Sequence, residues 1–359
     1  MTQFFGPSLS DAFGAQRTLV AVMVLWCALS GAFPWAAQHS SDAAFALRVL
    51  MGAAQGVTFP VVYYILRATV PEEERSRAIA VVSLGSTIGT TATFAAVPAL
   101  MERLGWDAPF VAGGLVLGPA FVLLWRRALP PNHSNVNAEK ASDDPKPAAG
   151  GFVAANLELF RHPLFVAIFV AHFTHNLALF GLLAWLPLFL KDVGVPPDRM
   201  WMASAPWVAQ ACAVLLSSVL VDRRVASDKA AGLADKSQVL AVRRRFLVAC
   251  YVTAAAAWAA VGAAVALGVA DAHALLVGAV SLGVAANGAA AASGYEACKL
   301  DATESAIASS RLQAMSNMLA TAAGVAGVEL ASQFAWSGTF AALAACFVAA
   351  AALFHAMAR

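Results

Sequence analysis

An arginine and a glutamine lie seven residues apart inside a long apolar stretch of the sequence. Arg48 and Gln55 belong to AAFALRVLMGAAQGVTFPVVYYIL, residues 43–66. Seven residues make almost two turns of α-helix, so both side chains share one face, about 10 Å apart along the axis. A guanidinium is a rigid fork of donors that matches phosphate or carboxylate, which makes Arg48 a candidate anion ligand.

Both residues leave an alternative open. Arg48 could instead extend to the membrane surface or join a structural ion pair. An ionisable residue inside a membrane is functional by default, so we favour the anion. Gln55 donates and accepts hydrogen bonds but does not titrate, so it could contact a substrate or join two helices.

A second polar group occurs in AHFTHN, where His172, His175 and Asn176 follow the spacing of one helical face. The pair of histidines could suggest a metal, but no third ligand is evident, so we predict no metal site.

One acid, Glu329, lies deep in another apolar stretch, AAGVAGVELASQF. It could lie in the middle of the membrane and bind a coupling ion there, or lie near a helix end without a role. The sequence leaves both possibilities open.

These residues require elements that can hold them in a bilayer. Of the 359 residues, 60% are hydrophobic and 12% are charged, and the mean hydropathy is +0.70. Soluble domains carry about a quarter charged residues. We therefore predict an all-α, multi-pass integral membrane protein. A spanning helix needs about 20 mostly apolar residues, and ten candidates lie near 18–38, 44–66, 78–101, 108–125, 163–190, 200–221, 246–270, 274–295, 312–334 and 338–358.

Other function classes lack support in the sequence. The net charge is +2, and no basic run is interleaved with aromatic residues, so we predict no nucleic-acid partner. The five cysteines are scattered singly and are typical of small hydrophobic side chains. Since no hydrolytic triad, P-loop or dinucleotide motif occurs, we predict neither an enzyme nor an ATP-driven pump, and no cofactor.

A polar segment divides the chain. Residues 130–151, PPNHSNVNAEKASDDPKPAAGG, carry too little apolar surface to fold alone and are typical of a flexible linker. We predict an incomplete N-terminal helix bundle at 1–129, a cytoplasmic linker at 130–161 and a C-terminal six-helix bundle at 162–359.

The distribution of basic residues supports this orientation. With the linker side cytoplasmic, all but four of the 23 Lys and Arg fall on that side or at its helix ends, a strong positive-inside bias. Membrane topology and contact with lipid headgroups suffice to explain the basic runs RRALPP, DRRVASDK and AVRRRF. The four exceptions are Arg48, Arg103, Lys191 and Arg199.

Two acidic and basic motifs indicate an internal repeat. Asp11, Gly14 and Arg17 lie in a predicted loop before the first predicted span, and Asp222 with Arg223 lies in the loop after the second span that follows the linker. If the halves are repeats, these motifs correspond, and the first half lacks its first helix and most of its second.

Two six-helix halves with a long central loop and these charged motifs resemble the major facilitator superfamily. There the loop glycine permits a tight turn, and the acidic and basic residues stabilise one packing of neighbouring helices. Pro7 and Ser218 stand where that motif usually has glycine.

Three longer stretches resemble one branch, the anion:cation symporter family, which includes sodium/phosphate cotransporters, plastid anion transporters and vesicular glutamate transporters. The stretches are 48–90, with Arg48, GVTFP and P-x-x-ERSR, then 162–195, with AHFTHN and WLP, and the looser 315–328. In that family the arginine matching Arg48 contributes to anion binding. A glutamate seven residues later is tied to proton coupling, and here that position is Gln55. The family has a polar or basic residue that faces the central cavity at the position of His175, so the resemblance implies that His175 and Asn176 complete an anion site opposite Arg48. Because histidine titrates near neutrality, His172 or His175 could replace the missing acid in proton coupling.

The resemblance implies a secondary transporter that moves a small anion by alternating access. We expect inorganic phosphate first, organic anions such as glutamate second, and sodium or a proton as coupling ion. The expected state is a monomer in a lipid bilayer, in a plastid or other organelle membrane, with the plasma membrane left open. The alternative is a non-transporting truncated or receptor-like scaffold, because the family's first helix contributes a further substrate arginine.

Overall fold

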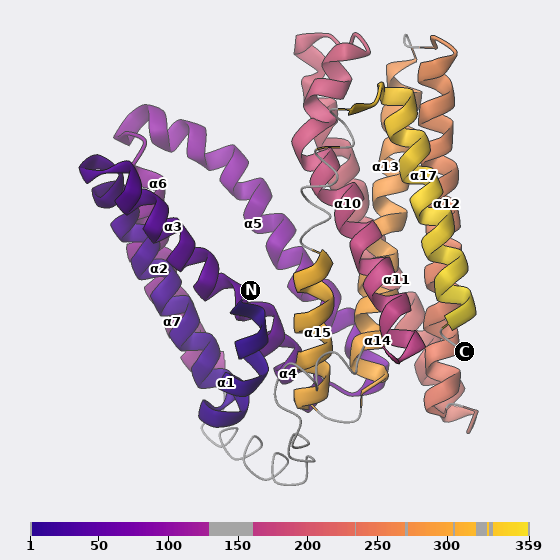
Figure 1. Cartoon of the computed structure of the whole chain (residues 1–359), viewed down its shortest axis with the longest axis horizontal. Coiled ribbons are helices and arrows are strands. Elements are labelled where there is room, and N and C mark those ends of the chain that lie inside the picture. The colour runs from indigo at the N-terminus through magenta and orange to yellow at the C-terminus, as the bar shows by residue number, and fades with distance from the viewer. Residues whose placement is uncertain are drawn as a thin grey trace. The chain divides into compact units, whose positions relative to one another are not determined.

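The computed structural model describes residues 2–128, 161–233, 235–269, 272–303, 306–320, 329 and 333–357. All regular elements in these ranges are helices (Figure 1). Those before the predicted linker are α1 (Phe5–Phe13), α2 (Ala15–His39), α3 (Ser41–Gly56), α4 (Thr58–Thr69), α5 (Arg75–Leu104), α6 (Ala108–Ala112) and α7 (Gly118–Ala128). Those after it are α10 (Pro163–Asp192), α11 (Ala205–Ala230), α12 (Lys236–Ala266), α13 (His273–Ala290), α14 (Glu296–Asp301), α15 (Ala306–Ala320) and α17 (Trp336–Met357).

Five short helical segments complete the description. Three are 3₁₀ turns and two are π-helical, in which an extra residue widens the turn. The 3₁₀ segments are η1 (Thr2–Phe4), η2 (Glu72–Glu74) and η6 (Pro197–Ser204), and the π-helical segments are η3 (Gly113–Leu117) and η7 (Ala291–Tyr295).

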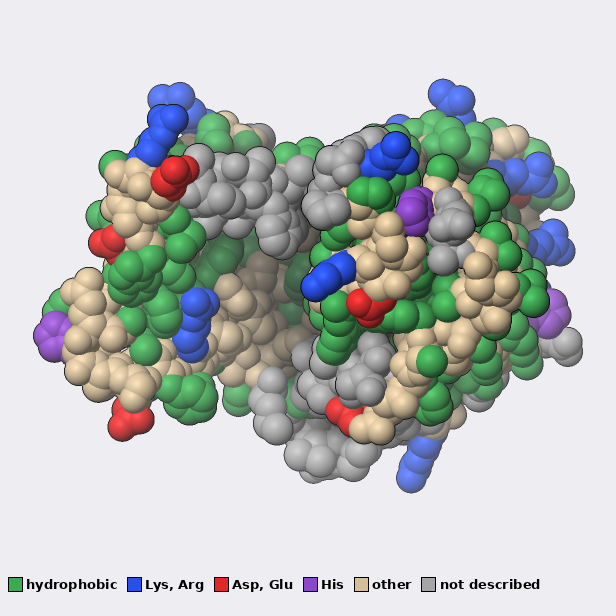
Figure 2. Space-filling model, turned by 90° about the horizontal axis from the view of Figure 1, so that it is seen from above, with side chains coloured by type: hydrophobic (Ala, Val, Ile, Leu, Met, Phe, Trp, Pro, Cys, Tyr) green, Lys and Arg blue, Asp and Glu red, His purple; other side chains and the backbone are tan. Residues whose placement is uncertain are grey.

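The predicted all-α membrane architecture is confirmed. Eight helical segments among the described residues are long and apolar enough to cross a bilayer, and each coincides with one of the ten predicted spans. The predicted span at 78–101 falls within α5, and the one at 312–334 begins in α15 and continues outside the described residues. Hydrophobic side chains reach the surface over much of the face in Figure 2. Large exposed ones such as Phe45, Leu115 and Leu216 face outward from the spans, as expected of a protein dissolved in lipid.

Local capping explains where several helices begin. The Ser40 hydroxyl accepts a hydrogen bond from the Ala43 N–H at 3.0 Å and starts α3. Asp235 does the same for α12 by accepting from the Gln238 N–H at 2.8 Å. The Ser237 hydroxyl and this N–H lower the pKa of the Asp235 carboxyl.

Contacts divide the chain into two compact units that do not follow the linker alone. The first contains 1–69, 88–152 and 303–315, and the second contains 70–87, 153–302 and 316–359. The beginning of α5 therefore belongs to the second unit, and the beginning of α15 to the first. The predicted linker lies almost entirely outside the described residues, so the division at 130–161 stays a prediction.

The first unit is centred on α2, which packs against α3, α4 and η3. Glycines allow the closest of these approaches. A Cβ placed on Gly114 would lie 2.7 Å from the Cα of Gly31 and 2.5 Å from the Cys27 carbonyl oxygen. One placed on Gly118 would lie 2.6 Å from the Cβ of Cys27. The small residues of GLVLG thus allow two helical segments to pack backbone against backbone.

The second unit is built around α12, which packs against α13 and α17 (Figure 1). Trp258 is fully buried at its centre, with its ring 6.0 Å from Phe340 and 6.3 Å from Phe347. Tyr251 lies about two turns before Trp258 on α12. Its hydroxyl donates a hydrogen bond to the Ala171 carbonyl at 2.6 Å. This bond fixes α12 beside α10, close to the histidines.

Gly114→Ala should lower the free energy of unfolding by about 1–3 kcal/mol, because an added methyl group must displace backbone atoms. Gly278→Ala is the matched control, since a Cβ there has no neighbour within 4 Å, and it should be neutral or slightly stabilising. Denaturant titration of both variants in mixed micelles measures the difference. Equal stability of the two variants would refute the close packing of η3 on α2.

Candidate functional site

Arg48 lies on α3 in the first unit with its side chain exposed. Its guanidinium carbon is 4.2 Å from the ring centre of Phe33 and 5.4 Å from that of Phe110. The two rings lie 4.8 Å apart and attract a cation through their π faces. Among the described residues no carboxylate forms an ion pair with Arg48. Its charged hydrogen-bond donors therefore stay available to an anion.

Gln55 is also exposed, two turns further along α3. Exposure of both side chains agrees with the shared face that their spacing predicts. The roles assigned to Arg48 and Gln55 stay predictions.

The polar face of α10 is buried in the second unit. His172, His175 and Asn176 are 4%, 9% and 6% exposed. His175 Nδ1 lies 3.0 Å from the Asn287 side-chain oxygen, and the Asn287 amide donates to the His175 carbonyl at 3.3 Å. This double contact joins α10 to α13. Because Arg48 belongs to the other unit, its predicted pairing with His175 and Asn176 stays a prediction.

Glu329, the remaining sequence candidate, is exposed and accepts a hydrogen bond from the Gln333 amide at 2.7 Å. Most of its predicted span lies outside the described residues, so both possibilities for Glu329 stay open. Within the described ranges, no cluster of three or more His, Cys, Asp or Glu could hold a metal ion.

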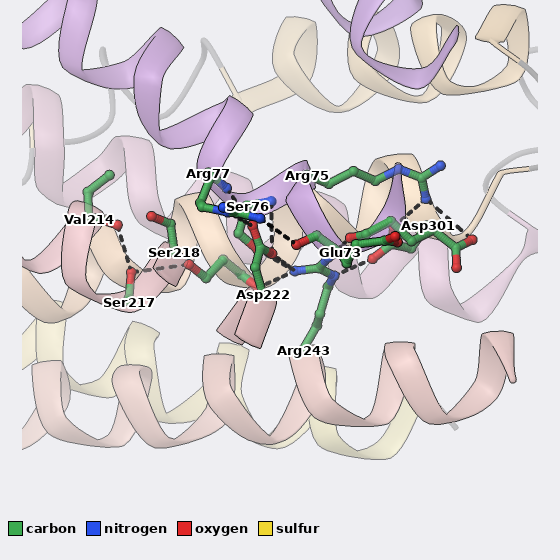
Figure 3. A network of polar contacts seen from close by, with 12 residues as sticks. Glu73, Arg75, Ser76, Arg77, Val214, Ser217, Ser218, Asp222, Arg243 and Asp301 are labelled. Carbon is green, nitrogen blue, oxygen red and sulfur yellow. Dashed lines mark hydrogen bonds and ion pairs between the residues drawn. The ribbon is translucent and has the colours of Figure 1, made fainter. Parts of the chain in front are cut away.

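Asp222 is buried and caps the beginning of α5 (Figure 3). Its carboxylate accepts hydrogen bonds from the backbone N–H of Ser76 at 3.2 Å and of Arg77 at 2.9 Å. These N–H groups have no partner inside their own helix, and the helix dipole favours a negative charge there. The side chains of Arg77 and Arg243 form ion pairs with the same carboxylate, at 3.5 and 3.9 Å.

A second buried acid, Asp301 at the end of α14, pairs with two arginines. Arg75 Nη1 donates to Asp301 Oδ1 at 2.5 Å, and Arg243 Nε donates to Oδ2. Arg243 also donates to the Ser76 hydroxyl at 2.5 Å and to the Glu72 carbonyl at 3.2 Å. One guanidinium thus contacts both carboxylates and the backbone before α5.

These residues, Arg75, Asp222, Arg243 and Asp301, form what we call the Arg/Asp network. It holds two positive and two negative charges, so the cost of removing them from water is offset within the cluster. The network joins the beginning of α5, which precedes the predicted linker, to α11, α12 and α14, which follow it (Figure 3). Nearby, the backbone of Glu73 itself and the Lys229 ammonium at 3.1 Å lower the pKa of Glu73.

The structure corrects several expectations for the charged motifs. Asp222 and Arg223 lie inside α11 rather than in a loop, because the helix continues to Ala230. Arg223 is exposed, and Arg77 and Arg243 pair with Asp222 instead. The side chain of Arg243, in AVRRRF, is 0% exposed, so lipid headgroups do not explain it.

In the first motif only the glycine takes the expected geometry. Gly14 has φ of +84° between α1 and α2, a conformation that glycine adopts without strain. Asp11 lies within α1 rather than in a loop, and Arg17 in the first turn of α2, and both are exposed.

The sequence analysis missed the network partners Arg75, Arg243 and Asp301. It also missed a buried contact of Lys299 with Glu296 and His172. Each of these charged residues lies in or beside an apolar stretch of the sequence. A charge in such a place requires an opposite charge nearby, and this requirement is the signal that could have identified them.

Apolar helices of spanning length and a buried charge network define a polytopic membrane protein. Residues 1–234 match the family model of the Major Facilitator Superfamily. The chain belongs to this superfamily. It is therefore a multi-pass membrane protein of a transporter family rather than an enzyme.

Curated relatives carry names of anion transporters. A probable anion transporter 3, chloroplastic, of Oryza sativa subsp. japonica is 28% identical over 240 residues, which cover 63% of this chain and 46% of that protein. The Homo sapiens voltage-gated purine nucleotide uniporter is 30% identical over 63% of this chain and 52% of its own. The Arabidopsis thaliana ascorbate transporter, chloroplastic, is 28% identical over 54% and 37%. The chain thus spans about half the length, or less, of the relatives it matches.

Solved structures confirm the fold. The proton:xylose symporter XylE matches with a TM-score of 0.76 and 13% identity, over 100% of this chain and 83% of that chain. The Escherichia coli fucose:proton symporter FucP matches with a TM-score of 0.65 and 11% identity, over 99% and 87%.

Asp222→Asn should lower the free energy of unfolding by about 3 kcal/mol, because it removes one charge from a buried cluster and leaves an arginine uncompensated. Asp228→Asn on the same helix is the control, since Asp228 pairs with the largely exposed Arg224, and exposed pairs contribute less than about 1 kcal/mol. Denaturant titration in mixed micelles compares them. Equal losses would contradict a network that holds α5 in place.

Proposed function

We propose that this protein is a secondary transporter that moves small anions across a membrane by alternating access. Inorganic phosphate is the first proposed substrate, and organic anions such as glutamate are the second. The observation that carries the proposal is the state of Arg48: a guanidinium in an apolar span that contacts two aromatic rings and no described carboxylate. A charge in such a place gains most from an anionic ligand.

The relatives support the substrate class. Their names mention anions, purine nucleotides and ascorbate. Nucleotides, phosphate and glutamate differ in size but share negatively charged phosphate or carboxylate oxygens, which a guanidinium binds in bidentate fashion.

The Arg/Asp network supports alternating access. It ties the beginning of α5 to helices that follow the linker, through ion pairs and hydrogen bonds rather than through apolar packing alone. Such contacts can be exchanged for water when a cytoplasmic opening forms, so the network would stabilise one of two arrangements. Asp222 and Arg243 are the residues to which we assign this function.

Several properties accompany the proposal. Sodium or a proton is the proposed coupling ion, and Gln55 does not titrate, so a proton requires another acceptor. The names of two of these relatives place them in the chloroplast, which supports an organelle membrane. We propose a monomer, since each copy of the fold would carry its own pathway.

Purified protein in liposomes should take up labelled phosphate faster than protein-free liposomes, and labelled glutamate more slowly than phosphate. Sodium, pH and voltage gradients are applied separately, so that the one that accelerates uptake identifies the driving force. Uptake of neither anion under any gradient would refute the anion transporter and favour a non-transporting scaffold.

Arg48→Ala should reduce anion uptake by at least about tenfold, because a lost charged hydrogen bond costs about 1.5–3 kcal/mol. Arg48→Lys should retain only part of the activity, since an ammonium lacks the planar fork. Arg103→Ala, which removes an exposed arginine at the end of α5, is the control. Unchanged uptake by Arg48→Ala protein with a normal unfolding midpoint would exclude Arg48 from the site.

A further inference from the structure

A second buried polar cluster lies next to the Arg/Asp network but does not belong to it. It begins where the π-helical segment η7 interrupts the span formed by α13 and α14. Within η7, Gly294 leaves helical geometry, with φ of −100° and ψ of −105°. Such π-helical breaks are frequent at functional sites, because they redirect the side chains that follow. The first residues of α14 carry Glu296 and Lys299, one turn apart.

Three ionisable side chains meet at this point. Lys299 Nζ lies 2.9 Å from Glu296 Oε2 and 3.0 Å from His172 Nδ1. The second carboxylate oxygen, Glu296 Oε1, lies 3.7 Å from His172 Nε2. The ring of Tyr295 covers the cluster, with its centre 5.1 Å from both Lys299 Nζ and the His172 ring. Each of the three side chains therefore faces the other two.

Hydrogen-bond chemistry assigns the protons. A lysine ammonium only donates, so His172 Nδ1 must accept from Lys299 and carry no proton. The neutral imidazole then holds its proton on Nε2, on the side of Glu296. A second proton on His172 would place two positive charges about 3 Å apart, which a buried site disfavours. This leaves the Glu296 carboxylate as the group of the cluster that can accept a proton.

The charged and titratable groups around Glu296 come from each helix packed against it. His172 and His175 face it from α10, and Tyr251 faces it from α12. Lys299 contacts it from its own helix. Further along, Arg243 of α12 pairs with Asp301, so these two charges compensate each other.

Exposure differs within the cluster in a way that suits proton exchange. The Lys299 side chain is 0% exposed and that of His172 is 6% exposed, whereas that of Glu296 is 12% exposed. The ammonium is thus fully buried, and the carboxylate is the most exposed member of the cluster.

We propose that Glu296 carries the coupling proton of this transporter, with Lys299 and His172 as the side chains that contact its carboxylate. This inference rests on the proposed function. When Glu296 binds a proton, its charge is lost and the Lys299 ammonium is no longer compensated by it, which favours entry of a substrate anion into the protein. When the proton leaves, the Glu296–Lys299 ion pair forms again and the anion is released. In each cycle one proton and one negative charge would then cross the membrane together. Gln55 would take no part in this proton transfer.

Glu296→Gln should abolish the acceleration of anion uptake by an inward pH gradient while leaving exchange of labelled for unlabelled anion in the absence of a gradient. Glu102→Gln, an exposed acid at the end of α5, is the matched control and should keep the acceleration. Persistent acceleration by a pH gradient in Glu296→Gln protein would overturn the proposal.

A measurement that does not depend on transport distinguishes failure of this proposal from failure of the proposed function. Infrared difference spectra of the purified protein between acidic and alkaline buffer should contain a protonated-carboxyl band that Glu296→Gln removes. If the wild type transports no anion but this band is present, the proposed function fails and the proton site stands. If no band depends on Glu296 at any pH, the proton site is wrong.

Folding of the variants has its own control. Glu296→Gln alone leaves a buried ammonium without its partner, whereas Glu296→Gln with Lys299→Met removes both charges and should restore the unfolding midpoint. If the single variant does not fold, the double variant takes its place in the uptake measurement. Acceleration of its uptake by a pH gradient would equally overturn the proposal.

Discussion

The pairing of buried charges in an apolar protein is the constraint on which the rest of this structure depends. A carboxylate or guanidinium removed from water costs several kcal/mol unless an opposite charge and hydrogen bonds replace the solvent. Asp301 meets this requirement by binding Arg75 and Arg243, and Asp222 by binding the backbone at the beginning of α5. These contacts hold α5, α11, α12 and α14 together, because each helix supplies one charged residue of the Arg/Asp network.

The same constraint relates the candidate sites to transport. The Arg/Asp network and the Glu296–Lys299 pair are neutral within themselves. Arg48 differs, since its described contacts are aromatic rings, which stabilise a cation only partly. An exposed arginine in an apolar span that pairs with no described carboxylate is suited to bind an anion. Protonation of Glu296 would remove a counter-charge from a second cation, Lys299, when the anion enters.

Much of the fold could be predicted from the sequence, because apolar runs of spanning length and a polar linker are local features. The spacing of Gly114 and Gly118 is also local, but the residues that they approach, Gly31 and Cys27, lie on another helix. The ion pairs could not be predicted in this way. Arg75 and Asp301 are 226 residues apart, and only the tertiary fold brings them together. Counting basic residues placed Arg243 and Lys299 at the membrane surface, whereas both are buried. For Glu296 the missing information was the π-helical break at Ala291–Tyr295, where Gly294 leaves helical geometry.

Proton uptake on anion binding tests the central claim, that an anion enters together with a compensating proton, most directly. Calorimetric titration of the purified protein with phosphate, repeated in buffers that differ in ionisation enthalpy, measures the number of protons bound per anion. The account predicts net uptake of about one proton per anion bound, because Glu296 changes from the charged to the neutral form. Binding heats that do not change between buffers would contradict it.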